Sequence, residues 1–124
     1  MGGPMDVKSL FENDDTVVAF RAGSSIFEEG KTGTVMYVVL DGQVEIRKGA
    51  KAIETLGPGS ILGEMSLIAA PKRSATAVAA TDCRLASVDE RRFLALVREY
   101  PFFALHVMRA LAERLRRMND LLTP

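Results

Sequence analysis

The sequence has few of the residues that build metal centres and disulfide frameworks. Its 124 residues include one cysteine, Cys83, and one histidine, His106. A single cysteine excludes an intramolecular disulfide framework and a multi-cysteine zinc site. His106 has no cysteine or carboxylate constellation around it, so we interpret it as a helix-face residue, not as a metal ligand or a catalytic base. With no nucleophile–base pair and no P-loop pattern either, we predict no enzymatic activity, no metal and no cofactor.

Net charge and long apolar runs are also lacking. Sixteen basic and sixteen acidic side chains cancel, so no overall field attracts nucleic acid or an anionic membrane. There is no apolar run of the roughly 18 residues that a membrane helix needs, and no signal-peptide layout at the start. We therefore predict a cytoplasmic protein with neither nucleic acid nor membrane as a partner. Any anion must be bound by a local site.

Short apolar runs alternate with glycines from about residue 16 to residue 89. Short strands separated by glycine-rich turns are typical of a sandwich or barrel, and the pattern favours an antiparallel one. Asp41-Gly42 lies between two such runs and predicts a hairpin, because a tight primed turn needs positive φ. Cys83 falls in an alternating run, where we expect a buried, inert thiol. The main runs are residues 17–20, 25–27, 36–40, 44–46, 76–80 and 84–88.

Helical patterns flank this strand-rich region in what we predict to be a single domain. After a flexible leader, residues 1–5, apolar spacing over residues 6–14 predicts a short amphipathic helix. Asp89 can cap a first C-terminal helix, which Tyr100-Pro101 should end. A second helix is then expected over residues 102–122. The C-terminal helices together occupy residues 89–122.

Residues 63–76 concentrate the most chemistry in the chain. They read Gly-Glu-Met-Ser-Leu-Ile-Ala-Ala-Pro-Lys-Arg-Ser-Ala-Thr. Gly63 lets the backbone approach a ligand closely, Glu64 can accept hydrogen bonds from hydroxyls, and free amides at the start of a short helix favour an anion. Arg73 adds a planar cation whose donors match phosphate oxygens. The segment predicts a sugar-phosphate site. Alternatively, Arg73 is a solvated residue or the ion-pair partner of Glu64.

Together with the segments before it, this cassette resembles the cyclic nucleotide-binding domain, the family of catabolite activator proteins, kinase regulators and cyclic nucleotide-gated channels. The segments are Ile-Phe-Glu-Glu-Gly at residues 26–30, Met-Tyr-Val-Val-Leu-Asp-Gly-Gln-Val-Glu-Ile at 36–46 and Leu-Gly-Pro-Gly at 56–59. The resemblance implies a mainly β fold. Its antiparallel jelly-roll-like barrel of eight strands would carry a short N-terminal helix, a short cassette helix and two C-terminal helices.

The resemblance also implies the roles of the cassette residues toward cyclic AMP or cyclic GMP. Glu64 would accept the ribose 2′-hydroxyl, and Arg73 would pair with the cyclic phosphate. Ser74 could contact the phosphate or the amino group of a guanine. The expected ligand-binding residues are Gly63, Glu64, Met65, Arg73, Ser74 and Ala75. Family members often carry a glycine before the arginine, whereas this chain has Ala-Ala-Pro-Lys at residues 69–72.

The last helix carries two further features. Met108, Leu111, Leu115, Met118 and Leu122 recur at intervals of three and four, which suits either a homodimer through this helix or packing on the chain's own barrel. By resemblance, Met118 and Asn119 could cap the purine base. The spacing from Glu113 to Arg117 and from Arg116 to Asp120 indicates a paired, solvated helix face.

These observations predict regulatory binding of a cyclic purine nucleotide, with cyclic AMP preferred over cyclic GMP. The C-terminal helices would transmit the signal by closing over the ligand. The alternative is a non-catalytic dimeric scaffold that keeps the fold without binding nucleotide. The sequence ends soon after the last helix. We therefore expect either a stand-alone sensor that acts on a separate effector protein or a fragment of a longer protein.

Overall fold

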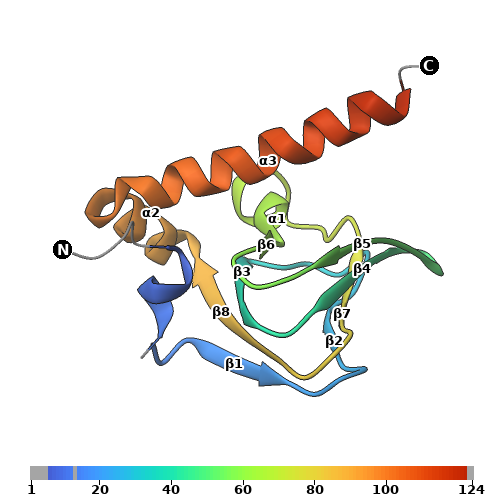
Figure 1. Ribbon diagram of the computed structural model, residues 1–124, viewed down its shortest axis with the longest axis horizontal. Helices are drawn as coiled ribbons and strands as arrows, with labels where there is room; N and C mark the ends of the chain where they lie inside the picture. Colours follow the sequence, from blue (N-terminus) through green and yellow to red (C-terminus); the bar gives the residue numbers. More distant parts are fainter. Residues whose placement is uncertain (1–5, 13, 123–124) are drawn as a thin grey trace.

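Two antiparallel four-stranded sheets form the body of the protein in the computed structural model, which describes residues 6–12 and 14–122 (Figure 1). The first sheet has the order β1 (Val17–Phe20), β8 (Cys83–Asp89), β3 (Val35–Asp41), β6 (Ile61–Leu62). The second has the order β2 (Ser25–Phe27), β7 (Thr76–Ala79), β4 (Val44–Lys48), β5 (Lys51–Leu56). The predicted fold class, an antiparallel barrel with flanking helices, is confirmed.

The space between the sheets is filled by aliphatic side chains from both. Val39, Leu62 and Leu85 of the first sheet meet Val44 and Leu56 of the second, together with alanines and Cys83. The alternation of these residues along each strand explains the packing, since every second side chain points to the same face. Cys83 is buried, as the sequence predicts.

The predicted hairpin at Asp41-Gly42 is wrong. Gly42 does turn the chain with φ of +91°. However, β3 pairs with β6 and β8, whereas β4 pairs with β5 and β7. The turn therefore carries the chain from one sheet to the other. A tight hairpin instead joins β4 and β5 at Gly49, where Lys48 lies opposite Lys51.

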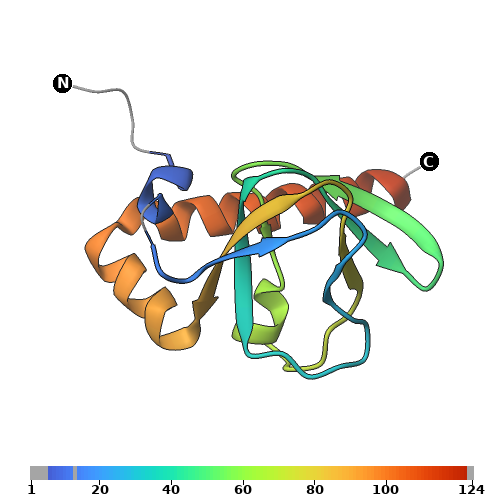
Figure 2. The same cartoon turned by 90° about the horizontal axis from the view of Figure 1, so that it is seen from below.

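Helices cover one end and one side of the barrel (Figure 2). The helix expected over residues 6–14 is a four-residue 3-10 helix, η1 (Lys8–Phe11), and the predicted leader lies outside the described residues. Asp89 is the N-cap of α2 (Glu90–Glu99), and its side chain accepts a 2.8 Å hydrogen bond from the Arg92 amide. α3 (Pro101–Leu122) follows directly.

An aromatic cluster attaches these helices to the barrel. The Phe103 ring of α3 makes edge contacts with Phe11 of η1 and Phe93 of α2, at centroid distances of 6.3 and 5.7 Å. Val107, one turn along α3 from Phe103, is also buried. The N-terminal half of α3 is thus part of a second core, whereas its C-terminal half extends across the cassette helix (Figure 1). Within the described part of the chain, none of the helices has both the length and the apolar character that a bilayer crossing requires.

Candidate functional site

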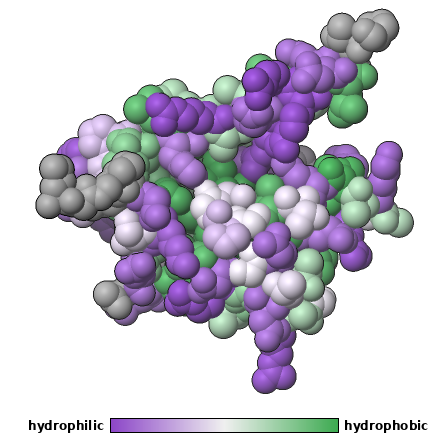
Figure 3. Space-filling view, in the orientation of Figure 1, coloured by the Kyte–Doolittle hydropathy of each residue, from purple (hydrophilic) through white to green (hydrophobic). Residues whose placement is uncertain are grey.

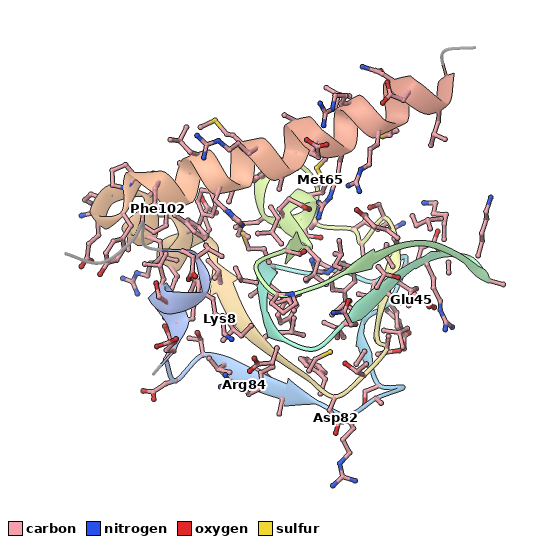
Figure 4. All side chains as sticks on the ribbon, viewed as in Figure 1. Lys8, Glu45, Met65, Asp82, Arg84 and Phe102 are labelled. Carbon is pink, nitrogen blue, oxygen red and sulfur yellow. The ribbon has the colours of Figure 1, made fainter. Side chains whose placement is uncertain are left out.

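A cavity of about 620 Å³ lies between the second sheet, the cassette helix α1 (Glu64–Ile68) and the C-terminal half of α3. Figure 4 shows Met65 of α1 directly beneath α3. The cassette residues predicted from the sequence converge on this cavity, although they come from both ends of a 13-residue segment. Those that line it are Gly63, Glu64, Met65, Arg73, Ser74 and Ala75. Their roles toward a ligand stay a prediction.

Gly63 brings the backbone of the cassette close to Arg73. Its φ of +77° is a left-handed backbone conformation that residues with a Cβ rarely adopt. A Cβ at this position would lie 2.6 Å from Nη1 of Arg73. The glycine is therefore required twice, once for the turn that starts α1 and once for the approach of the guanidinium.

Arg73 is buried, with 5% of its surface exposed. Its backbone is fixed by the β2–β3 loop: the Arg73 amide donates to Lys31 O at 2.8 Å, and the Gly30 amide donates to Arg73 O at 2.9 Å. The guanidinium donates to Gly63 O at 3.1 Å and to Val35 O at 2.8 Å, and it lies 4.2 Å from the centroid of the Phe27 ring. Both the loop and the barrel wall hold this side chain in place.

Within the described part of the chain, the buried charge of Arg73 lacks an anionic partner. Across residues 6–12 and 14–122, no carboxylate lies within ion-pair distance of its guanidinium, and its Nε is a buried nitrogen without a hydrogen-bond partner. Burial lowers the pKa of Arg73, while Tyr37 and Glu64 act in the opposite direction. Two of the five N–H groups of an arginine are used here. The site therefore favours an added anion.

Glu64 does not pair with Arg73, so that alternative from the sequence is wrong. Its carboxylate forms an ion pair with Arg114 of α3 and accepts a 3.2 Å hydrogen bond from the Met65 amide. Arg114 also donates to the carbonyl oxygen of Ile61. Glu64 is 3% exposed, and its pairing connects α1 to α3 across one side of the cavity.

A second ion pair crosses the same cavity. Arg117 Nη2 lies 2.7 Å from Glu54 Oε1 of β5, and both residues line the cavity. The expected pairing of Arg117 with Glu113 is wrong, because Glu113 pairs with Arg116. Glu54, Arg114 and Arg117 also line the cavity, which the sequence did not predict. The spacing of Arg114, Arg117 and Met118 along one helix face could have indicated two of them.

The two predicted base-capping residues differ in position. Met118 lines the cavity and is 59% exposed, whereas Asn119 is exposed outside the cavity lining. His106 lies elsewhere, with Nε2 2.7 Å from Gly59 O. Within the described ranges, no three His, Cys, Asp or Glu side chains converge so as to hold a metal ion.

Known proteins share the sequence pattern and the fold of this chain. Residues 17–100 match the family described as "Cyclic nucleotide-binding domain". The chain is 37% identical over 105 residues to the cyclic AMP receptor protein of Thermus thermophilus, covering 81% of this chain and 49% of the relative. It is 36% identical over 88 residues to a cAMP-dependent protein kinase regulatory subunit of Eremothecium gossypii, covering 71% of this chain and 19% of that one.

Solved structures give the same result. The crystal structure of the Thermus thermophilus catabolite activator protein has a TM-score of 0.76 at 35% identity, over 86% of this chain and 52% of that one. A structure described as "A cyclic-GMP-dependent signalling pathway regulates bacterial phytopathogenesis" has a TM-score of 0.70 at 31% identity, over 81% and 84% of the two chains. The chain spans about half the length of the receptor-type relatives that it matches. It belongs to the cyclic nucleotide-binding domain family.

Proposed function

We propose that this chain is a non-catalytic regulatory domain that binds a cyclic purine nucleotide, with cyclic AMP preferred over cyclic GMP. The observation that carries the proposal is the buried Arg73, which lacks a carboxylate partner within the described residues and lines a cavity. A buried cation is costly unless it is paired. A cyclic phosphate would supply the missing charge, and guanidinium and phosphate match in geometry.

The rest of the cavity suits the other parts of such a ligand. Its volume of about 620 Å³ is within the range of small-molecule sites. An ionised carboxylate has about four lone-pair positions. Glu64 uses two of its own for Arg114 and the Met65 amide, so a ribose hydroxyl could be added without breaking the pair. Apolar side chains such as Ile46, Leu56 and Met118 would contact the base.

The preference for cyclic AMP is supported by the names of several relatives. These include a cyclic AMP receptor protein and CRP-like cAMP-activated regulators of Mycobacterium tuberculosis, the latter 30% identical over 108 residues. A cGMP-dependent protein kinase of Drosophila melanogaster is also similar, at 34% identity over 76 residues. Thermal unfolding with both nucleotides tests the preference.

The output of the domain would pass through α3. Arg114 connects α3 to Glu64, which we assign to the ribose, so a ligand that contacts Glu64 acts on the helix directly. Ligand binding would favour one orientation of α3 over others, because a ligand shifts a conformational equilibrium by its differential affinity for the two states. A separate effector protein could recognise that orientation.

The cytoplasmic location of the protein stays a prediction.

The exposed face of α3 is the second element of the proposal. Met108 and Leu115 are 56% and 60% exposed, and Leu105 lies one turn before Met108. Leu111, also from the predicted stripe, packs on the chain's own core, and the Leu122 side chain is outside the described residues. Hydrophobic side chains interrupt the hydrophilic surface of α3 in the space-filling view (Figure 3). We assign this face to a homodimer formed by two copies of α3.

Thermal unfolding with each cyclic nucleotide tests the binding proposal. A ligand that binds the folded state raises its stability by mass action, and one present at 100 times its Kd contributes about 2.7 kcal/mol. We expect cyclic AMP to raise the melting temperature at lower concentration than cyclic GMP, and 5′-AMP to have little effect. If neither cyclic nucleotide changes the melting temperature at millimolar concentration, the scaffold alternative is correct.

A further inference from the structure

The ion pair between Glu54 and Arg117 lies in an otherwise apolar part of the nucleotide cavity. Ile46, Ile53 and Leu56 line this part from the second sheet, and Met118 and Leu121 line it from α3. Glu54 is the cross-strand partner of Ile46 and lies two residues before Leu56, so the three side chains share one face of the sheet. The Glu54 carboxylate, an acceptor, and the Arg117 guanidinium, a donor, therefore lie next to each other beside the apolar residues of the second sheet and of α3.

The position of this pair relative to the cassette assigns it to one part of a nucleotide. Arg114 contacts Glu64 and Arg117 contacts Glu54, and the two arginines are three residues apart on α3, or about 4.5 Å along its axis. If Arg73 binds the phosphate and Glu64 the ribose, the part of the cavity next to Glu54 remains for the base. Its apolar walls suit the faces of a planar ring, and the ion pair is placed to meet the ring's polar edge.

We propose that Glu54 and Arg117 form hydrogen bonds to the edge of the purine and thereby select adenine over guanine. Glu54 accepts a hydrogen bond from the 6-amino group, and Arg117 donates to the neighbouring ring nitrogen. Adenine presents such a donor next to an acceptor, whereas guanine presents an oxygen at the same position. A guanine oxygen would face the Glu54 carboxylate, acceptor against acceptor. This inference rests on the proposed function and names the residues that select its ligand.

Titration calorimetry of the full chain with three ligands tests this assignment. The ligands are cyclic AMP, cyclic GMP and the cyclic phosphate of purine riboside, which is cyclic AMP without its amino group. We expect the unsubstituted chain to bind cyclic AMP about 10- to 100-fold more tightly than the analogue, the usual effect of one hydrogen bond to a charged group. In Glu54→Ala the ratio of the two dissociation constants, for the analogue and for cyclic AMP, should fall to about one. In Glu54→Gln the side-chain amide can donate a hydrogen bond to the guanine oxygen. The difference in affinity between cyclic AMP and cyclic GMP should therefore become smaller.

Glu45→Ala is the matched control. Glu45 lies on β4 opposite Thr55, pairs with Arg47 and is outside the cavity lining (Figure 4). Its removal should leave the ratio between cyclic AMP and the analogue unchanged. The assignment is wrong if Glu54→Ala keeps the ratio of the unsubstituted chain, or if it weakens all three ligands equally, as a merely structural residue would. Failure of the unsubstituted chain to bind any of the three instead overturns the proposed function.

Discussion

Arg114 of α3 forms an ion pair with Glu64, which begins the cassette helix 50 residues earlier in the chain. Because Glu64 is buried and Arg114 partly buried, the pair is shielded from water better than a surface ion pair. It is also the contact through which a ligand at Glu64 would reach α3. Both the attachment of α3 to the barrel and its response to ligand should depend on it.

Replacing Arg114 by methionine should therefore destabilise the protein. Methionine keeps the aliphatic length but leaves the Glu64 carboxylate buried without its cation, which should cost about 1–3 kcal/mol of unfolding free energy. Urea denaturation measures this loss. In a Glu64→Gln background the same replacement should cost clearly less, because no buried charge is left behind. Equal losses in the two backgrounds would mean that Arg114 acts through its contact with Ile61 O or through packing.

Arg73→Ala should weaken the binding of cyclic AMP tenfold to a few hundredfold. Charge-assisted hydrogen bonds contribute about 1.5–3 kcal/mol each, and the alanine removes those to the phosphate. Arg73→Lys should recover only part of the affinity, since lysine lacks the bidentate fork. The neighbouring Lys72→Ala is the control, because Lys72 is exposed and outside the cavity lining. Unchanged calorimetric titrations of Arg73→Ala would refute phosphate binding by this residue.

Gly33→Ala should displace the Arg73 side chain. A Cβ on Gly33 would lie 2.2 Å from Arg73 Nε, far closer than any real contact. We expect a loss of about 1–3 kcal/mol in unfolding free energy from this overpacking, together with weaker binding of cyclic AMP. In an Arg73→Ala background the stability loss should largely disappear, since the clashing atoms are gone. A loss that persists there would show that the alanine clashes with the backbone instead.

Asp41 should give the stability of the fold a pH-dependent component. Hydrogen bonds from Arg84 and Lys8, at 2.6 and 3.1 Å, lower its pKa below the ordinary value of 3.8. A lowered pKa in the folded state means that the ionised group stabilises the fold at pH values above 3.8 and that this stabilisation is lost as the pH falls through the lowered pKa. The difference in unfolding free energy between the unsubstituted chain and Asp41→Asn should thus be largest near neutral pH and shrink in acid. Added salt should reduce it as well, because the group is exposed. A difference that is constant with pH would contradict this.

Leu115→Glu should convert a dimer into a monomer. The change places a charge on the exposed face of α3 that we assign to the second copy, where two like charges would meet. Sedimentation velocity distinguishes the two states directly. Leu94→Glu alters an equally exposed leucine on α2 and should leave the dimer intact. A monomer in the unsubstituted chain at all accessible concentrations would overturn the assignment.

The fold and the cassette were predictable because their signals are local. Glycines between alternating apolar runs mark the strands, and Asp89 and Pro101 mark the ends of the helices. Asp41-Gly42 shows the limit of such signals: the turn chemistry predicts where the chain reverses but not which strands then pair. The barrel closes through pairings such as β1 with β8, between residues distant in sequence.

The cavity residues of β5 and α3 could not be predicted for the same reason. Arg117 has a carboxylate four residues before it on α3, and helix periodicity alone favours that neighbour. The structure pairs it with Glu54 instead, 63 residues earlier, since α3 passes over β5. Likewise, Glu64 and Arg73 look like natural partners nine positions apart, yet the barrel wall occupies Arg73 and α3 supplies the cation for Glu64. Only the tertiary arrangement decides between such candidates.

The length of α3 has a mechanical consequence. Its 22 residues make a rod about 33 Å long, fixed near one end by the buried Phe103 and Val107. A tilt of about 10° around Phe103 would move the other end by about 5 Å. The aromatic cluster is thus the pivot of α3, and the ion pairs with Glu64 and Glu54 hold the helix between that pivot and its C-terminal end. A displacement of a few tenths of an ångström at those carboxylates would produce a larger displacement at the C-terminal end.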